Sequence, residues 1–460
     1  MILKALLVLA CTVFAAPVPG ITLPPPLEDD FYEAPSNLHE LKNGEVYNQR
    51  QVTPNFQLQL SFSEVWQVAY KTTNTQGEDS HTITTIFKPN HPAPEQQIFS
   101  YQVWEDADQL NCSPSYGLAK GILAPDGITT VIDTAVAIKF GLSQGWYVAV
   151  PDHEGPRSAF IAGYEQGQAG LDGIRAAENF LGMTQDTQVA MYGYSGGASA
   201  TAWMANLQPT YAPELNIVGA VHGGTPVDIL ATIEYLDKPD RAFSGFIVGA
   251  FAGLLHAYPE KNESVWPHLD QSLKDKLNEI QTPDNCVLTE ILKDGYTEYH
   301  TQADIDLLSF PPAVEVFTNE SLLTNVSTGI LNTPKFPRYI YHADEDEIIP
   351  AGAVRQYVQQ QCAMGANIQY VPWLGNNHVG IEYMGIPDAF QFLIQAFKGE
   401  TPQVLCGTPN DDVLTLASKG VSAIIGQPIV DVLNGLVGVT LKGFKVIFNP
   451  DAPYEEGQTP

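Results

Sequence analysis

The most constraining feature of the sequence is a serine that stands between glycines at the end of an apolar run. Residues 188–192 (QVAMY) predict a buried strand, residues 193–197 (GYSGG) a tight turn and residues 198–207 (ASATAWMANL) a helix. Glycines suit such a turn because side chains would collide where the strand and the helix pack closely together. The pattern therefore predicts a strand–turn–helix unit that presents the hydroxyl of Ser195 at an exposed bend.

An alternation of strand patterns and helix patterns surrounds this unit. Such alternation favours a mostly parallel sheet whose two faces are covered by helices. It is interrupted between residues 226 and 325, where helical patterns dominate. We therefore expect an α/β core with a mostly helical insertion. The strand patterns lie at 96–104, 145–156, 338–343 and 367–373, and the remaining helix patterns at 170–182, 352–365 and 388–399.

The chemistry of a serine nucleophile points to further residues. A serine hydroxyl needs an imidazole base, and the base needs a carboxylate partner. A Gly-x-Ser-x-Gly turn between a strand and a helix is the nucleophile elbow of α/β-hydrolases, in which the acid and then the histidine follow the serine. Asp344 and Asp346 follow the strand at 338–343, and His378 is the only histidine after them. Chain order thus predicts a triad of Ser195, one of these aspartates and His378.

Of the two aspartates, we favour Asp346. Many α/β-hydrolases carry a pattern like H-G-x-x-D-x-x-V-P here; with His342 as its first residue, Asp346 falls on the acid and Ile349-Pro350 on the V-P. Asp344 stays the alternative. The nearby acids Glu345 and Glu347 are expected to face solvent.

Acyl transfer through a serine also needs hydrogen-bond donors for the oxyanion of the tetrahedral intermediate. The backbone N–H of Gly196, directly after the serine, is one predicted donor. The second is expected from the loop within residues 102–112. This chemistry requires no metal and no organic cofactor. A metal site in the segment 151–156 (PDHEGP) is not favoured, because adjacent loop residues rarely converge on one ion.

The amino-terminal residues predict secretion to the outside of the cell. They contain one lysine, then an apolar stretch from Ala5 to Phe14, and then small residues. This order is typical of a signal peptide, which we place at about residues 1–16. The stretch is too short to cross a bilayer. The net charge of −30 argues against nucleic acid as a partner, because phosphates need clustered lysines and arginines. The charge is compatible with neutral lipids or uncharged esters.

Secretion would allow the cysteines to form disulfides and the N-x-S/T sequons to carry glycans. Four cysteines remain after removal of the signal peptide, which predicts two disulfides with three possible pairings. The absence of a C-x-x-C pair disfavours zinc. Sequons for N-linked glycans occur four times. The cysteines are Cys112, Cys286, Cys362 and Cys406, and the sequon asparagines are Asn111, Asn262, Asn319 and Asn325. Occupancy of Asn111 is in doubt because it adjoins Cys112.

Five segments together resemble the secreted lipases of Candida-type yeasts. They are EDADQLNCSPSYG (105–117), VPDHEGP (150–156), GYSGGASATAWMANLQPTYAPEL (193–215), HADEDEIIPAG (342–352) and NNHVG (376–380). The similarity runs from about residue 29 to the carboxyl terminus, and the segment around Ser195 is its most specific part.

The resemblance implies an α/β-hydrolase core with a helical cap, and hydrolysis of triacylglycerol or other esters. We predict no stable protein partner. The resemblance assigns the nucleophile to Ser195, the acid to Asp346 and the base to His378. It assigns the oxyanion role to Gly196 and Asp106, with Asp108 as the alternative to Asp106. It further implies the disulfides Cys112–Cys286 and Cys362–Cys406, and a carboxyl-terminal flap over the site.

We therefore expect five segments. They are a signal peptide (1–16), an arm and the first part of the core (17–225), a cap (226–325), the second part of the core (326–410) and the flap (411–460). In the cap, Gly245, Gly249 and Gly253 share one helical face. This face predicts either a groove for an acyl chain or close helix packing.

The favoured function is a secreted serine lipase acting at an oil–water interface. The alternatives are an esterase or acyltransferase for soluble esters, and a non-catalytic lipid-binding or adhesion protein.

Overall fold

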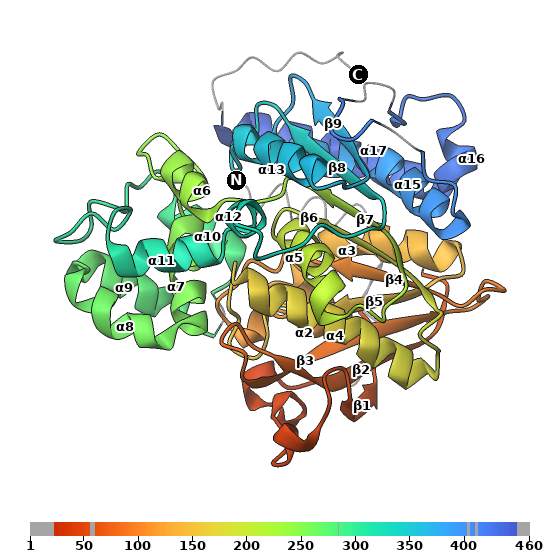
Figure 1. Cartoon of the computed structure of the whole chain (residues 1–460), viewed down its shortest axis with the longest axis horizontal. Coiled ribbons are helices and arrows are strands. Elements are labelled where there is room, and N and C mark those ends of the chain that lie inside the picture. The colour runs from red at the N-terminus through yellow and green to blue at the C-terminus, as the bar shows by residue number, and fades with distance from the viewer. Residues whose placement is uncertain (1–22, 56–59, 284, 403–404, 410–412, 449–460) are drawn as a thin grey trace.

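The core is one large sheet with helices on both faces (Figure 1). The computed structural model describes residues 23–55, 60–283, 285–402, 405–409 and 413–448. Within these residues, nine strands pair in the order β1-β2-β3-β5-β4-β6-β7-β8-β9. The strands are β1 (Val46–Gln51), β2 (Phe62–Thr73), β3 (Asp79–Pro89), β4 (Gln97–Gln102), β5 (Tyr147–Pro151), β6 (Gln188–Tyr194), β7 (Ile217–Gly223), β8 (Arg338–Ala343) and β9 (Ile368–Trp373).

Strand direction divides the sheet into two parts. β1, β2 and β3 form an antiparallel meander that joins β5, whereas β5, β4 and β6 to β9 are parallel. Residue 102 of β4 pairs with residue 193 of β6, which pairs with residue 222 of β7, which pairs with residue 340 of β8. The parallel strands therefore end at one edge, and the loops that follow them meet there. The predicted α/β-hydrolase core has this mostly parallel architecture.

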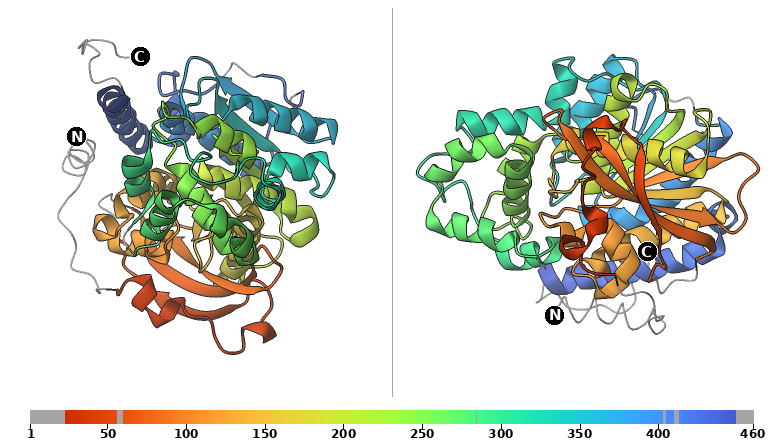
Figure 2. Two further views of the ribbon diagram at one scale, coloured as in Figure 1. Left: turned by 90° about the vertical axis from the view of Figure 1, so that its left-hand side faces the viewer. Right: turned by 90° about the horizontal axis from the view of Figure 1, so that it is seen from below.

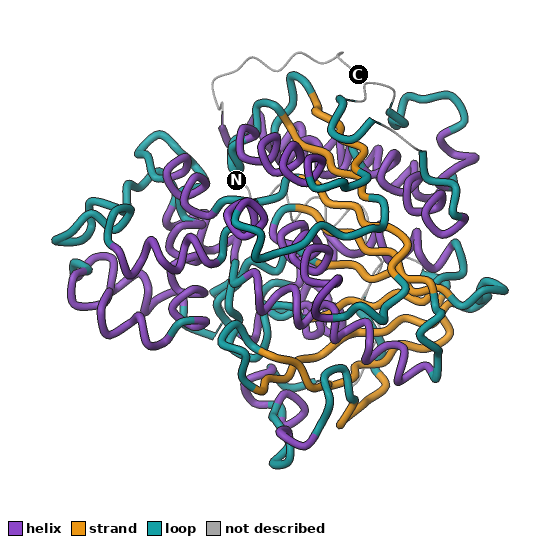
Figure 3. The backbone as a smooth tube through the Cα atoms, viewed as in Figure 1, coloured by secondary structure: helices purple, strands orange, loops and turns teal. Residues whose placement is uncertain are grey.

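Helices cover the two faces of the sheet (Figure 3). One face packs against α4 (Gly163–Leu181), α5 (Gly196–Tyr211) and α13 (Ala351–Ala363), and the other against α3 (Gly127–Ser143) and α15 (Ile386–Lys398). β6 and β8 are buried along nearly their whole length, as expected for strands with helices on both sides. The other core helices are α2 (Pro114–Lys120) and α14 (His378–Met384), and the short 3₁₀ turns are η1 (Pro26–Glu28), η2 (Asp30–Tyr32), η3 (Leu38–Glu40), η4 (Leu110–Cys112), η5 (Gly121–Leu123) and η6 (Trp266–His268).

A group of helices between β7 and β8 projects to one side of the sheet (Figures 1 and 2). We call this group the cap. It comprises α6 (Ile229–Leu236), α7 (Phe246–Ala257), α8 (Pro259–Val265), α9 (Gln271–Ile280), α10 (Val287–Asp294), α11 (Pro311–Asn319) and α12 (Leu322–Ser327). These helices occupy the stretch in which the sequence predicts a helical insertion.

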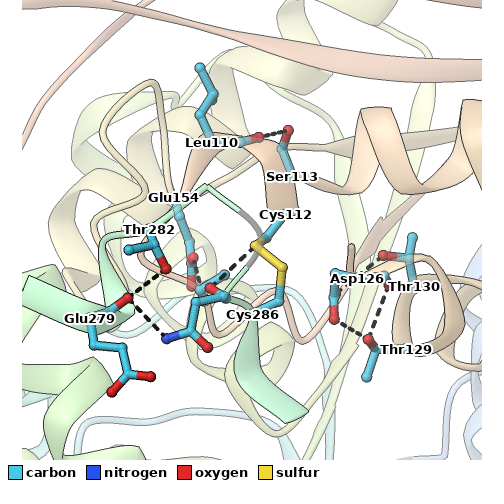
Figure 4. The surroundings of a disulfide bond; sticks show 12 residues. Leu110, Cys112, Ser113, Asp126, Thr129, Thr130, Glu154, Glu279, Thr282 and Cys286 are labelled. Carbon is cyan, nitrogen blue, oxygen red and sulfur yellow. Dashed lines mark hydrogen bonds between the residues drawn. A yellow bond between two sulfur atoms is a disulfide. The ribbon is translucent and has the colours of Figure 1, made fainter. Parts of the chain in front are cut away.

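A disulfide and a buried carboxyl group are among the contacts that tie the cap to the core. The disulfide Cys112–Cys286 joins η4, in the loop after β4, to the start of α10 (Figure 4). Glu320, between α11 and α12, is buried and accepts hydrogen bonds from the Tyr258 hydroxyl at 2.6 Å and from the Tyr164 backbone N–H at 3.2 Å. Because Tyr164 lies in the first turn of α4, Glu320 connects the cap to a core helix.

The second disulfide, Cys362–Cys406, joins α13 to the segment after α15. Both pairings are the ones implied by the resemblance to yeast lipases. The carboxyl-terminal segment contains α16 (Val421–Ile425) and α17 (Gln427–Phe448), and α17 lies beside α3 and α14. Ile429 and Leu433 of α17 join the same apolar cluster as Ile381 of α14. A flap that covers the site stays a prediction.

Several sequence predictions concern residues outside this description or are changed by it. The predicted signal peptide (1–16) lies outside the described residues. Asn111 and Asn325 are buried and their amides are hydrogen-bonded to the protein, which leaves no room for a glycan. These two glycosylation predictions are therefore corrected, whereas Asn262 and Asn319 are exposed on the cap. Among the described residues, no helix combines the length and the apolar character needed to cross a membrane.

Buried carboxyl groups make stability depend on pH. Burial raises the pKa of Asp126 to about 8, and of Glu165 and Glu320 to about 7. In the unfolded chain these groups have pKa values of about 4, so the folded protein keeps protons that the unfolded chain has released. Their stabilising effect is complete below about pH 4 and is lost as the pH rises to about 8.

We predict that the free energy of unfolding, measured by urea denaturation, falls between about pH 5 and about pH 8, because each of these groups lowers it by up to about 1.4 kcal/mol per pH unit between its unfolded and its folded pKa. The double variant Glu165→Gln, Glu320→Gln should show a smaller fall, because an amide does not titrate. An equal fall in the wild type and in this variant would contradict the assignment.

Candidate functional site

Ser195 occupies a strained turn between β6 and α5. Its backbone has φ of 53° and ψ of −120°, a left-handed conformation that is rare for a residue with a side chain. The turn is fixed by hydrogen bonds from the Ser195 N–H to the carbonyl of Gly223 at 3.0 Å and from the Ser199 N–H to the carbonyl of Ser195 at 3.0 Å. A side chain at Gly193 would overlap the backbone of Gly197. The glycines therefore permit the close approach of strand and helix that the sequence pattern predicts.

His378 lies within hydrogen-bonding distance of the serine. It is the first residue of α14, directly after the loop that follows β9. Its Nε2 is 2.9 Å from Ser195 Oγ. Its Nδ1 is 2.8 Å from Oδ2 of Asp346, in the turn after β8. If Nδ1 donates its proton to the carboxylate, Nε2 is free to accept the proton of the serine hydroxyl. The structure thus brings the three predicted residues into one chain of hydrogen bonds.

The turn after β8 holds Asp346 firmly. Its Oδ1 accepts hydrogen bonds from the N–H groups of Ile348 at 2.9 Å and Ile349 at 2.7 Å. The imidazole of His342 also faces the carboxylate, with Nε2 3.4 Å from Oδ2. Burial alone would raise the pKa of Asp346, but the nearby His378 and His342 and these hydrogen bonds hold it below its ordinary value. Asp346 is therefore a carboxylate at neutral pH.

The same groups act on the imidazole of His378. Burial by itself would lower the pKa of His378, but the Asp346 carboxylate and its hydrogen bond outweigh burial and raise that pKa to about 9. The carboxyl groups of Glu347 and Glu382 act in the same direction. The surroundings thus stabilise the imidazolium form that a general base takes after it accepts a proton.

Asp344, the alternative acid, lies elsewhere. Its side chain is exposed, and Oδ1 accepts the N–H of Gly375 at 2.7 Å. Glu345 is exposed, as predicted. Glu347 does not simply face solvent, because it is half-buried and its Oε2 accepts the backbone N–H of His378 at 2.6 Å. The expectation for Glu347 was wrong because the loop before His378 folds back over the turn after β8.

Asp106 and Gly196 lie beside Ser195, where the oxyanion role was assigned. Both line the same narrow cavity as Ser195, and a side chain on Gly196 would overlap the carboxyl group of Asp106. Asp106 has a left-handed φ of 45°, and its buried Oδ1 has no hydrogen-bond partner among the described residues. Burial raises the pKa of Asp106 to about 7. Asp108 is also buried but is not among the residues that line this cavity.

The cavity beside Ser195 is almost entirely apolar and has a volume of about 50 Å³. Its walls come from the loop at 160–161, from α6 and α7 of the cap, and from the turn after β8. The apolar wall residues include Phe160, Ile229, Ile233, Phe246, Ile247 and Ile349. The cap therefore supplies an apolar surface directly against the serine.

The glycine face of α7 packs against the core and does not line the cavity beside Ser195. A side chain at Gly253 would overlap the backbone of Phe160. Phe246, Ile247 and Ala250 of α7 line the cavity, but Gly245, Gly249 and Gly253 are not among its lining residues. Of the two readings of this face, the contact at Gly253 supports close packing of the helix against the loop.

Known proteins are similar to this chain over most of its length. The family model described as secretory lipase matches residues 123–404. Lipase A of Moesziomyces aphidis is 38% identical, with 94% of this chain and 93% of the relative covered. A secreted triacylglycerol lipase, LIP1, of Malassezia furfur is 31% identical, with 89% of this chain and 83% of the relative covered.

A solved structure has the same fold. The X-ray structure of Candida antarctica lipase A in its closed state superposes with a TM-score of 0.86 at 38% identity. The superposition covers 90% of this chain and 96% of the chain of Candida antarctica lipase A. The resemblance to secreted yeast lipases and the α/β-hydrolase fold are both confirmed. On the family match and these relatives, the chain belongs to the secretory lipase family.

Proposed function

We propose that this protein is a secreted serine lipase that hydrolyses triacylglycerols and other fatty-acid esters through an acyl-enzyme. The observation that carries the proposal is the distance of 2.9 Å between Ser195 Oγ and His378 Nε2, with Asp346 on the far side of the imidazole. This arrangement has the geometry of a nucleophile, a base and an orienting acid.

In the first half of the reaction, Ser195 Oγ attacks the ester carbonyl while His378 Nε2 accepts the hydroxyl proton. The backbone N–H of Gly196 and the loop at Asp106 stabilise the resulting oxyanion. His378 then donates its proton to the leaving alcohol, and the acyl group stays on Ser195. In the second half, water loses a proton to His378 and attacks the acyl carbonyl. His378 then donates that proton to Ser195 Oγ as the bond to the acyl group breaks, which releases the fatty acid and restores the serine.

The apolar cavity supports a fatty-acyl substrate. Each buried CH₂ group of an acyl chain would contribute about 0.8 kcal/mol to binding. The cavity of about 50 Å³ is too small for a long chain, so the proposal includes a movement of the cap or of the carboxyl-terminal segment on substrate entry. Relatives named as lipases, one of them a secreted triacylglycerol lipase, support the substrate class.

Secretion rests on the predicted signal peptide at residues 1–16 and on two disulfides, which persist in oxidising surroundings. The proposed site of action is an oil–water interface outside the cell.

We predict that Ser195→Ala lowers kcat for tributyrin hydrolysis by about 10⁶-fold, because loss of a triad serine leaves only binding and oxyanion stabilisation. Circular dichroism should show an unchanged fold. A fluorophosphonate probe should label the wild type and not the variant. A fully active variant would disprove the serine mechanism, and an unlabelled, inactive wild type would favour a non-catalytic lipid-binding protein.

The choice of acid is tested by two matched variants. Asp346→Asn should lower kcat by about 10⁴-fold, since an amide favours the wrong tautomer of the histidine. Asp344→Asn changes an exposed carboxylate and should leave kcat close to that of the wild type. The reverse order of activities would move the acid to Asp344.

The lipase reading and the esterase reading differ in their response to an interface. We predict that the rate of hydrolysis of one ester, followed across its solubility limit, rises when droplets form, because the apolar cavity opens to a chain presented at an apolar surface. A rate that saturates below the solubility limit, with no rise above it, would favour an esterase for soluble esters.

A further inference from the structure

The carboxylate of Glu347 accepts hydrogen bonds from the backbone of His378 and of the residue after it. Oε2 accepts the N–H of His378 at 2.6 Å, and Oε1 accepts the N–H of Val379 at 3.4 Å. Both N–H groups belong to the first turn of α14, where no intrahelical carbonyl is available to them. The third N–H group of this turn, that of Gly380, donates to the side chain of Asn377 at 2.8 Å. Glu347 therefore satisfies two backbone groups that the helix leaves free.

One short turn holds His378 at two points. Asp346 accepts a hydrogen bond at the ring nitrogen Nδ1, and the adjacent Glu347 accepts one at the backbone nitrogen. From β6, the Tyr194 hydroxyl donates to the carbonyl of His378 at 2.6 Å. With Nε2 beside Ser195 Oγ, every polar group of His378 has a partner. Rotation of the residue as a whole is thus opposed at the backbone as well as at the ring.

We propose that Glu347 is a positioning residue for His378: its carboxylate fixes the backbone of the histidine and adds a second negative charge that favours the imidazolium. The proposal rests on the proposed function, because it takes His378 as the general base. Glu347 does not touch the reacting atoms.

The effect of the Glu347 charge on the imidazolium follows from the groups around the ring of His378. A carboxylate near an imidazole stabilises its protonated form, whereas a neutral amide in the same place does not. Burial raises the pKa of Glu347 above its ordinary value, and the neighbouring His378 and its backbone hydrogen bond offset only part of this rise. Among the described residues, the titratable groups facing His378 are Asp106, Tyr194, His342, Asp346, Glu347 and Glu382.

The test compares Glu347→Gln, Glu347→Ala and the control Glu345→Gln. Glutamine keeps a hydrogen-bond acceptor and removes the charge, alanine removes both, and Glu345→Gln makes the same charge change on an exposed side chain two residues away. The measurement is kcat/KM for p-nitrophenyl butyrate from about pH 5 to about pH 10, whose acidic limb reports the ionisation of the base in the free enzyme.

We expect Glu347→Gln to move the acidic limb to lower pH by about 0.5 to 1 unit, because the imidazolium loses a stabilising charge. Glu347→Ala should show the same shift and, in addition, a lower plateau of kcat with KM little changed. Glu345→Gln should superpose on the wild type. An acidic limb of Glu347→Gln that coincides with that of Glu345→Gln would overturn the proposal.

A second measurement does not depend on turnover. The proton between His378 and Asp346 gives a downfield NMR signal whose pH titration should move with the acidic limb in Glu347→Gln. An unmoved titration would also overturn the proposal. Failure of the proposed function would look different: the wild type itself would lack ester hydrolysis that depends on Ser195.

Discussion

The left-handed turn at Ser195 is the constraint on which the rest of the site depends. A residue with a side chain adopts this conformation only when its surroundings hold it there, at a cost of about 1–3 kcal/mol. Here β6, α5 and the end of β7 supply that restraint through backbone hydrogen bonds and close glycine contacts. The strain keeps the hydroxyl out of the helix and directed at His378. The parallel sheet is thus the frame that holds the Ser195 hydroxyl beside His378.

Three carboxyl groups near His378 show how surroundings assign different roles to one functional group. Asp346 has a depressed pKa because hydrogen bonds and nearby imidazoles favour its anion. Asp106 has a raised pKa because it is buried and its Oδ1 finds no donor among the described residues. Burial also raises the pKa of Glu347, although the backbone N–H groups that donate to its carboxylate oppose this rise. Position in the fold, and not residue type, decides which group is charged near neutral pH.

Much of this could be predicted from the sequence because the rules involved are local or ordered along the chain. Periodicity predicted the alternating core. The order of serine, acid and histidine selected Ser195, His378 and one of two aspartates, and the pattern that begins at His342 favoured Asp346 over Asp344. The role of Glu347 could not be predicted, because it depends on how the loop at 374–377 folds back over another loop. For the same reason, a three-residue sequon did not reveal that Asn325 is buried. The packing of Gly253 depends on Phe160, which lies far away in the sequence.

The link between the cap and the loop after β4 has a mechanical consequence. Cys112 closes the loop that carries Asp106, and Cys286 lies at the start of α10, so the disulfide joins this cap helix to the loop whose Asp106 lies beside Gly196. Ala107, next to Asp106, packs against the same disulfide. A displacement of the cap near α10 would therefore be transmitted to the loop that carries Asp106. Glu320 ties a second part of the cap to α4, and the Tyr235 hydroxyl of α6 donates to the carbonyl of Asp346 at 2.9 Å, so a movement of the cap that widens the cavity must work against these contacts as well.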